Sequence, residues 1–198
     1  GGRLSRVNQL VSLNGYGASS ALRGLSLATG WQLSDVHTQV THAVPDCNSE
    51  QEQRNAVADR GRIVWRGAVK VPRGADNTTA AQLCRSLLLS DGARVDIQPC
   101  LEIDTDDVVC THGATVSDLD DEVRTARTAT AAHTYTSSHL LHASHLTVSL
   151  CTLLLLQMIF YLQARGLSRV QARSLLLAGW ARDALSRVPS EGAKERAA

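Results

Sequence analysis

A cysteine and a histidine stand two residues apart in the segment Val109–Val116, which reads Val-Cys-Thr-His-Gly-Ala-Thr-Val. Residues i and i+2 of a β-strand point to the same face, so a strand here would place the Cys110 thiol beside the His112 imidazole. Thiolate and imidazole suit iron, zinc and iron–sulfur chemistry. The pair alone is weak support for a metal site, because a structural or accidental pair would show the same spacing in the sequence. Gly113 would let the chain bend or another backbone come close.

The other cysteines do not form a motif with this pair. The five cysteines are odd in number, widely spaced and without a Cys-x-x-Cys motif. This predicts a reducing compartment rather than a disulfide framework. Cys47 and Cys84 are expected to be small buried apolar residues. Cys100 and Glu102 would share one face of a strand, where we expect packing or a solvated edge rather than direct chemistry.

Composition narrows the class of protein. The chain has 198 residues, enough for one ordinary domain or part of a larger one. Its 20 basic and 19 acidic residues give a net charge of +1, which offers no reason to expect nucleic acid or an anionic membrane as a partner. With only seven aromatic residues, the core must be built from Leu, Val, Ile and Ala, as repetitive β architectures do well.

Short strands and turns dominate the chain up to residue 116. Gly-Ala pairs at residues 74–75, 92–93 and 113–114 suggest a β-solenoid with a period near 20 residues, with Gly at a corner and Ala pointing inward. A series of antiparallel hairpins is the alternative. The six-residue aliphatic repeat of hexapeptide acyltransferases is absent, and a cupin-like metal barrel would need several His on neighbouring strands. The strand-like segments are 4–7, 9–13, 21–27, 62–66, 68–71, 86–90, 94–97, 101–103 and 108–110.

The last part of the chain has helix signals. Residues 159–165 are typical of the end of a helix, with Gly166 as its C′ residue. Ser168-Arg169-Val170-Gln171 is a capping box that would start a second helix. This helix would carry an apolar stripe and stop before Pro189. The stripe could pack against the β body or form a docking surface. Its members are Leu177, Ala181, Ala184 or Leu185, and Val188.

Several segments together resemble one known family. Leu101-Glu102-Ile103 is followed by Asp106-Asp107-Val108 and then by Cys110-Thr111-His112-Gly113-Ala114-Thr115-Val116. This block and the segments around it resemble the C-terminal half of the SufB/SufD family of iron–sulfur cluster assembly scaffolds, and within it the SufD members. The other matching segments are residues 46–49, 67–71, 86–90 and 160–166.

The resemblance implies a mainly β fold. Residues 1–116 would form a right-handed parallel β-helix, whose N-terminal coils we expect to precede this chain. Residues 117–122 together with 158–189 would form a short C-terminal α-helical domain, and the tail 190–198 is expected to be loose. It also implies a non-catalytic scaffold subunit that pairs with SufB through its β-helix and docks the SufC ATPase through its C-terminal helices.

The resemblance further assigns roles to individual residues. His112 matches the family histidine at the SufB interface, where a transient iron–sulfur cluster forms with a SufB cysteine, and Cys110 matches a neighbouring cysteine. No cofactor would be held permanently, and neither nucleic acid nor membrane would be a partner. The alternative function is a stand-alone β-helix metalloenzyme that uses Cys110 and His112. The residues expected to dock SufC are Phe160, Tyr161, Arg165, Leu177 and Trp180.

Residues 123–157 do not fit the family pattern. They hold four of the seven histidines and a leucine-rich run. A membrane anchor would need almost all of residues 146–162, and Gln157 interrupts that stretch. A metal site would rest on His139, His142 and His145, which recur every third residue without a carboxylate or Cys among them.

We favour a third interpretation of this segment, a translated intron. The Val123 codon begins with GT, Gln157 can be encoded by CAG, and the residues before it can be encoded by a pyrimidine-rich tract. Removing the segment joins Glu122 to Met158 in one continuous helix. An intron would make the source eukaryotic, and this family would then lie in the plastid stroma; otherwise the cytoplasm is expected.

Overall fold

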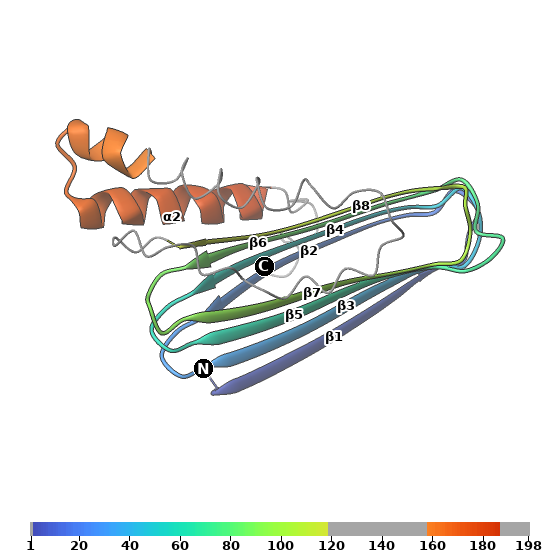
Figure 1. Cartoon of the computed structure of the whole chain (residues 1–198), viewed down its shortest axis with the longest axis horizontal. Helices are drawn as coiled ribbons and strands as arrows, with labels where there is room; N and C mark the ends of the chain where they lie inside the picture. Colours follow the sequence, from blue (N-terminus) through green and yellow to red (C-terminus); the bar gives the residue numbers. More distant parts are fainter. Residues whose placement is uncertain (1, 119–157, 187–198) are drawn as a thin grey trace, which may run out of the picture. The chain divides into compact units, whose positions relative to one another are not determined.

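The computed structural model describes residues 2–118 and 158–186, which belong to two compact units. The first unit is a parallel β-solenoid whose strands run back and forth in two layers (Figure 1). Its described residues form eight strands of 10 or 11 residues. They are β1 (Leu4–Leu13), β2 (Ser19–Ala28), β3 (Leu33–His42), β4 (Asn48–Val57), β5 (Arg62–Val71), β6 (Thr78–Leu88), β7 (Arg94–Ile103) and β8 (Val108–Asp118).

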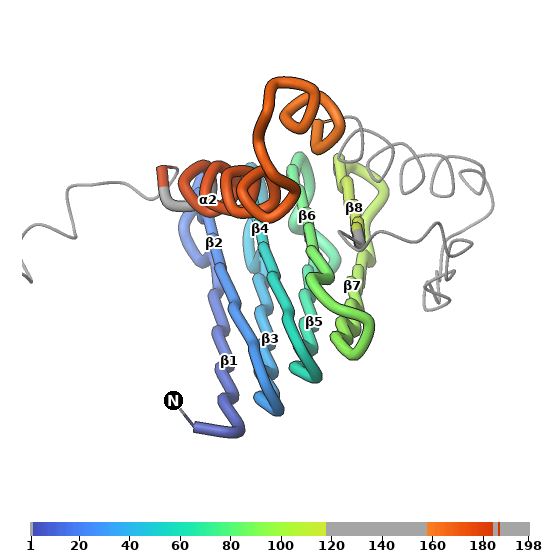
Figure 2. Tube along the Cα trace, turned by 90° about the vertical axis from the view of Figure 1, so that its left-hand side faces the viewer, coloured from blue at the N-terminus to red at the C-terminus, as the bar shows by residue number. Residues whose placement is uncertain are grey.

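Odd-numbered strands form one sheet, β1-β3-β5-β7, and even-numbered strands form the other, β2-β4-β6-β8 (Figure 2). All neighbouring pairs within each sheet are parallel. Each coil contributes one strand to each sheet, which gives four coils. The predicted β-solenoid is confirmed and the alternative of antiparallel hairpins is wrong. Strand β8 runs on through Asp118, two residues past the predicted end of the β-helix.

The coil is longer than the period that the Gly-Ala pairs predicted. The register partners Arg6 and Asp35 are 29 residues apart in sequence, and the register partners Asn55 and Ser86 are 31 residues apart. The Gly-Ala pairs predicted too short a coil because they do not occupy equivalent positions in successive coils. Those at 74–75 and 92–93 lie in turns at opposite ends of one coil, with both alanines buried, whereas 113–114 lies inside β8.

Gly67 and Pro99 do not end strands, although the predicted segments stop on either side of them. The predicted segments 62–66 and 68–71 are one strand through Gly67, and 94–97 and 101–103 are one strand through Pro99. Gly67 and Pro99 are register partners. A proline is tolerated in β7 because, among the described strands, β7 has a neighbour on one side only.

The interior is more polar than an aliphatic core. Strand β4, with the sequence Asn-Ser-Glu-Gln-Glu-Gln-Arg-Asn-Ala-Val, was not predicted because it lacks apolar alternation. Its amides are satisfied inside the solenoid: Thr38 of β3 donates across the core to Gln51 Oε1 at 2.8 Å, and Asn55 donates along the same sheet to Ser86 at 3.0 Å. Aliphatic clusters, one of them around Val69, pack beside this polar layer.

The second unit contains two helical segments. Residues 158–164 are helical, and Gly166 follows with a φ of 88°. The Gly166 and Leu167 amides donate to the carbonyls of Gln163 and Leu162 at 2.9 and 3.3 Å, which is a Schellman motif. The predicted capping box also forms, because Ser168 N donates to Gln171 Oε1 at 2.9 Å and Gln171 N to Ser168 Oγ at 3.4 Å.

The second helix, α2 (Arg169–Ser186), ends before Pro189 as predicted. In its predicted stripe, Leu177 and Ala181 are half-buried, whereas the remaining side chains are outside the described set. Neither described helical segment is long and apolar enough to cross a membrane. The segment 123–157, with its anchor, metal and intron interpretations, and the tail 190–198 lie outside the described residues.

Candidate functional site

The Cys-x-His pair lies in β8, where alternation of the strand puts both side chains on one face. Cys110 is the register partner of Ala80, and His112 is the partner of Gln82. Ala80 and Gln82 are buried residues of β6, and Cys110 packs on the buried cluster around Val69 and Ala80. Both side chains of the pair therefore belong to the inward face of the last described coil, and the shared face predicted from their spacing is confirmed.

The two side chains differ in their access to solvent. Cys110 is half-buried, whereas His112 is exposed although its strand neighbour Gln82 is buried. Burial raises the pKa of the Cys110 thiol, and a hydrogen bond with the Ala80 backbone opposes this only in part. A thiol must lose its proton to bind a metal, so Cys110 is the less ready ligand of the two. His112 offers an accessible imidazole.

Cys100 and Glu102 share a face, as their spacing predicts, but it is not the face of the Cys-x-His pair. Both are exposed on β7, with Cys100 Sγ 4.0 Å from Glu102 Oε1. Lys70 Nζ lies 2.8 Å from Glu102 Oε2, and this partner raises the pKa of Lys70. The pair thus belongs to a row of charges on the outer face of β1-β3-β5-β7.

Two further cysteines are structural. Cys47 and Cys84 are 1% and 0% exposed, as predicted. Burial raises the pKa of Cys84 to about 12, against hydrogen bonds from Ser86 and Asn55 that act the other way. A thiol with this pKa stays protonated at neutral pH and does not compete for a metal.

No three His, Cys, Asp or Glu side chains in residues 2–118 and 158–186 are grouped so that they could hold a metal ion. The Cys110 and His112 donors suit an iron–sulfur cluster in kind, since one is a soft sulfur ligand and the other an imidazole. Two donors remain short of the four ligands usual for such a cluster. Any cluster here would need ligands from beyond this part of the chain.

The residues predicted to dock a partner lie in the second unit. Phe160 and Tyr161 are 74% and 55% exposed, and the Arg165 guanidinium stacks 4.6 Å from the centre of the Tyr161 ring. Leu177 and Trp180, both in α2, are half-buried. The aromatic pair of the first helical segment is therefore the accessible part of the predicted surface.

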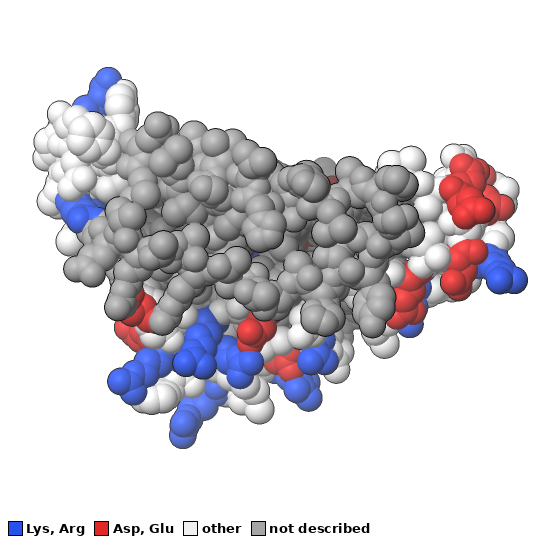
Figure 3. Space-filling model, in the orientation of Figure 1, with Lys and Arg blue, Asp and Glu red and all other residues white. Residues whose placement is uncertain are grey.

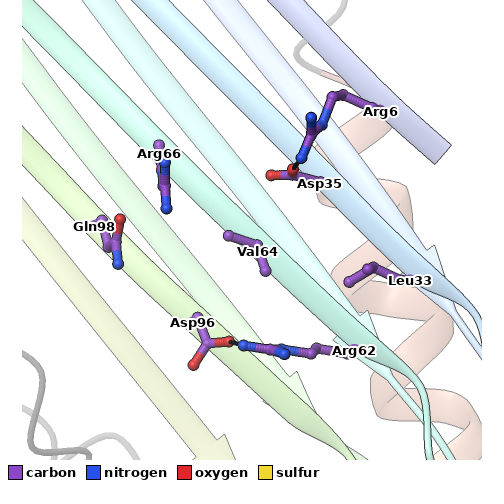
Figure 4. Close-up of a pocket in the computed structure, with 8 residues that line it drawn as sticks. All are labelled: Arg6, Leu33, Asp35, Arg62, Val64, Arg66, Asp96 and Gln98. Atoms are coloured by element: carbon purple, nitrogen blue, oxygen red, sulfur yellow. Dashed lines mark hydrogen bonds and ion pairs between the residues drawn. The ribbon is translucent and has the colours of Figure 1, made fainter. Parts of the chain in front are cut away.

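The structure also reveals a charged hollow that the sequence did not predict. It lies on the outer face of β1-β3-β5-β7 and has a volume of about 290 Å³ (Figure 4). Arg6 pairs with Asp35 at 2.6 Å, and Arg62 pairs with Asp96 at 2.5 Å. Figure 3 shows Lys and Arg side chains interleaved with Asp and Glu over this sheet. The members of the two pairs are 29 and 34 residues apart in sequence, so only the coil length could have revealed them.

Comparison with known proteins decides the family. The family model described as "SUF system FeS cluster assembly, SufBD core domain" matches residues 1–123, which is more than half of the chain. The chain belongs to the SufB/SufD family. The matched residues include all eight strands and the Cys-x-His pair. The SufB/SufD family is one of iron–sulfur cluster assembly proteins, so the predicted family is confirmed.

Curated relatives within the family agree. The chain is 29% identical to the iron–sulfur cluster assembly protein SufD of Escherichia coli over 99% of its length, and 30% identical to a SufBD family protein of Synechocystis over 96%. It is 30% identical to the chloroplastic protein ABCI7 of Arabidopsis thaliana over 100%. The chain spans only 34 to 38% of the length of these relatives.

Proposed function

We propose that this chain is the C-terminal part of a SufD-type scaffold subunit, on which an iron–sulfur cluster is built as cargo rather than kept as a cofactor. The observation that carries the proposal is the position of His112, exposed on the inward face of the last described coil beside the half-buried Cys110. An accessible imidazole can serve as one ligand of a nascent cluster. Cys110 has the secondary role, since its thiol holds its proton.

The remaining ligands would come from SufB. Among the described strands, β7 and β8 each have a neighbour on one side only. The unpaired backbone groups of such an edge suit pairing with another sheet. SufB pairing at this edge would bring a SufB cysteine to His112 and complete the ligand set. The chain itself would then hold the cluster and catalyse no reaction of its own.

Exposed aromatic residues support a docking role for the second unit. Phe160 and Tyr161 are large apolar groups at a surface, and aromatic anchors carry much of the binding energy of protein interfaces. Arg165, stacked on Tyr161, adds a charge to this surface. We assign it, with Leu177 and Trp180, to the SufC ATPase.

Replacing the histidine tests the proposed site. His112→Ala in the full-length protein, co-expressed with SufB and SufC, is expected to leave the complex intact and to lower cluster yield by about tenfold or more, as loss of a metal-site contact does. Complex formation is measured by size-exclusion chromatography, and cluster yield by iron and sulfide content and visible absorbance.

The matched control is Thr111→Ala, which changes the exposed neighbour on the opposite face of β8 and should leave cluster yield unchanged. Normal yield with His112→Ala would refute the role of His112. Tight stoichiometric iron binding or turnover by the isolated full-length chain would instead favour the stand-alone metalloenzyme that uses Cys110 and His112.

The docking surface has its own test. Phe160→Ala and Tyr161→Ala should each weaken SufC binding by about 2 kcal/mol, more than tenfold in Kd, because each removes an exposed aromatic anchor. The measurement is isothermal titration of SufC into the SufB–SufD complex. Gln163→Ala, an exposed polar change in the same helical segment, serves as the control. Unchanged affinity in both aromatic variants would place SufC elsewhere.

We also propose a cellular location, based on the relatives. A chloroplastic relative supports the plastid stroma for a eukaryotic source, and the bacterial SufD supports the cytoplasm otherwise. Fluorescence microscopy of the full-length gene product fused to a fluorescent protein distinguishes the two. Signal confined to a third compartment would contradict both.

A further inference from the structure

The rung of side chains beneath His112 contains a buried amide without a partner. Leu22, Gln51, Gln82 and His112 are register partners across β2, β4, β6 and β8. Gln82 is 3% exposed, and neither Nε2 nor Oε1 has a hydrogen-bond partner in the described structure. An unpaired buried amide costs stability, so its persistence in this position calls for a partner.

Two neighbours of Gln82 could supply such a partner: Trp65 across the core, whose buried Nε1 is also unpartnered within the described residues, and His112 on β8. On the β4 side, Gln51 is already bonded to Thr38 and to the Ala68 carbonyl, at 2.8 and 3.0 Å. Across the core lies Gly67, where an added Cβ would collide with the Gln82 amide and the Trp65 ring. On the β8 side lies His112, whose strand is spaced by the usual 4.7–4.9 Å or so of paired strands.

We propose that Gln82 is a positioning residue for His112. A turn of the exposed His112 ring would let Gln82 Oε1 accept its ring N–H, and this bond would direct the other ring nitrogen toward the cluster. The inference rests on the proposed function and deepens it. A metal-binding histidine donates its second N–H to an acceptor that fixes ring orientation and tautomer, and Gln82 is the buried acceptor next to His112.

The chemistry of neutral imidazole makes this bond consequential. One nitrogen carries the proton and the other carries the lone pair that binds iron. If the protonated nitrogen is held at Gln82, the lone pair is presented outward on every molecule rather than on a fraction. The exposed ring of His112 would otherwise rotate freely, and its lone pair would have no fixed direction.

The test reads the ring itself rather than the cluster. Full-length protein labelled with ¹⁵N-histidine is studied by NMR without iron, with His112→Ala used to assign the ring signals. The wild type should show a His112 N–H protected from exchange with water and one dominant tautomer. Gln82→Leu, or Gln82→Met as a second variant of similar size, should lose that protection and show mixed tautomers.

Gln51→Leu is the matched control. It removes a buried amide from the same rung, but from a strand not adjacent to β8, and should leave the His112 signals unchanged. Gln82→Leu should also lower cluster yield in the complex about tenfold, as loss of a partner to a ligand does. A wild-type His112 N–H that exchanges freely would overturn the inference, whether or not the variants fold.

The results separate the two proposals. If His112→Ala abolishes cluster formation while Gln82→Leu leaves the His112 ring unchanged, His112 keeps its function and Gln82 loses its role. If Gln82→Leu frees the ring while His112→Ala retains full cluster yield, the hydrogen bond exists but has no part in assembly.

Discussion

Cys110 and His112 lie on the same face of β8, but their side chains differ in exposure and in readiness to bind a metal. Strand alternation was enough to predict that they share a face. It could not predict that His112 is exposed and Cys110 half-buried, because those properties depend on residues of the preceding coil, far away in sequence. The neighbour Gln82 escaped notice for the same reason. Only the register of β6 and β8 puts it beside His112.

A second histidine makes stability depend on pH. His42 is 0% exposed, its Nε2 lies 2.8 Å from Ser49 Oγ, and burial lowers its pKa below the ordinary 6.5. The unfolded chain therefore takes up a proton more readily, so the contribution of His42 to stability is complete above about pH 6.5 and is lost as the pH falls toward its folded pKa.

Urea unfolding of the full-length protein between pH 8 and pH 5 measures this loss. His42→Gln should flatten the fall in unfolding free energy over that range. Parallel curves for wild type and His42→Gln would show that His42 is not the group responsible.

At the scale of elements, the sequence was informative where local signals act and silent where packing decides. The Schellman motif at Gly166 and the capping box at Ser168 were predicted residue by residue, since both are local. Strand β4 was missed because its polar side chains pair inside the solenoid rather than with solvent. Gly67 was predicted to separate two strands. It lies inside β5, where the absence of a side chain leaves room for Gln82 and Trp65.

That space gives a prediction for β5. Gly67→Ala should lower the free energy of unfolding by about 1–3 kcal/mol, the usual cost of overpacking, because the new methyl group meets Gln82 and Trp65. Chemical denaturation gives the value. Gly113→Ala in β8 is the control: its methyl group would meet only the flexible end of Leu83 at 3.3 Å, so a change within about 0.5 kcal/mol is expected. A neutral Gly67→Ala would mean that the core there is loosely packed.

At the scale of the whole first unit, the coil is the repeating quantity. The family resemblance and the short strands were enough to predict a β-solenoid, but not the length of its coils, which is 29 residues between the register partners Arg6 and Asp35 and 31 between Asn55 and Ser86. Coil length is set by two strands plus two turns, and the predicted strands stop on either side of Gly67 and Pro99. Each coil contacts only the coils beside it. A shift in the register of one coil therefore shifts the register of the next.

Single-residue insertions test this view. One alanine inserted between Pro72 and Arg73, in the turn between β5 and β6, should cost about 1 kcal/mol or less, since turns absorb length. One alanine inserted between Val64 and Trp65 would exchange the faces of half of β5 and turn the buried Trp65 outward, at a cost of several kcal/mol. Circular dichroism and denaturation curves give both values. Equal costs would show that β5 forms a bulge instead.

The tryptophans give the molecule three separate optical reporters. Trp31, in the turn between β2 and β3, is 66% exposed and lies 4.7 Å under the Arg60 guanidinium, whereas Trp65 is 1% exposed. Trp180 lies in α2 of the other unit. Red-shifted, readily quenched emission therefore belongs to Trp31, and blue-shifted, shielded emission to Trp65. Fluorescence of single-tryptophan variants would follow the opening of a solenoid turn, the loss of the core and the melting of the helix as three distinct events.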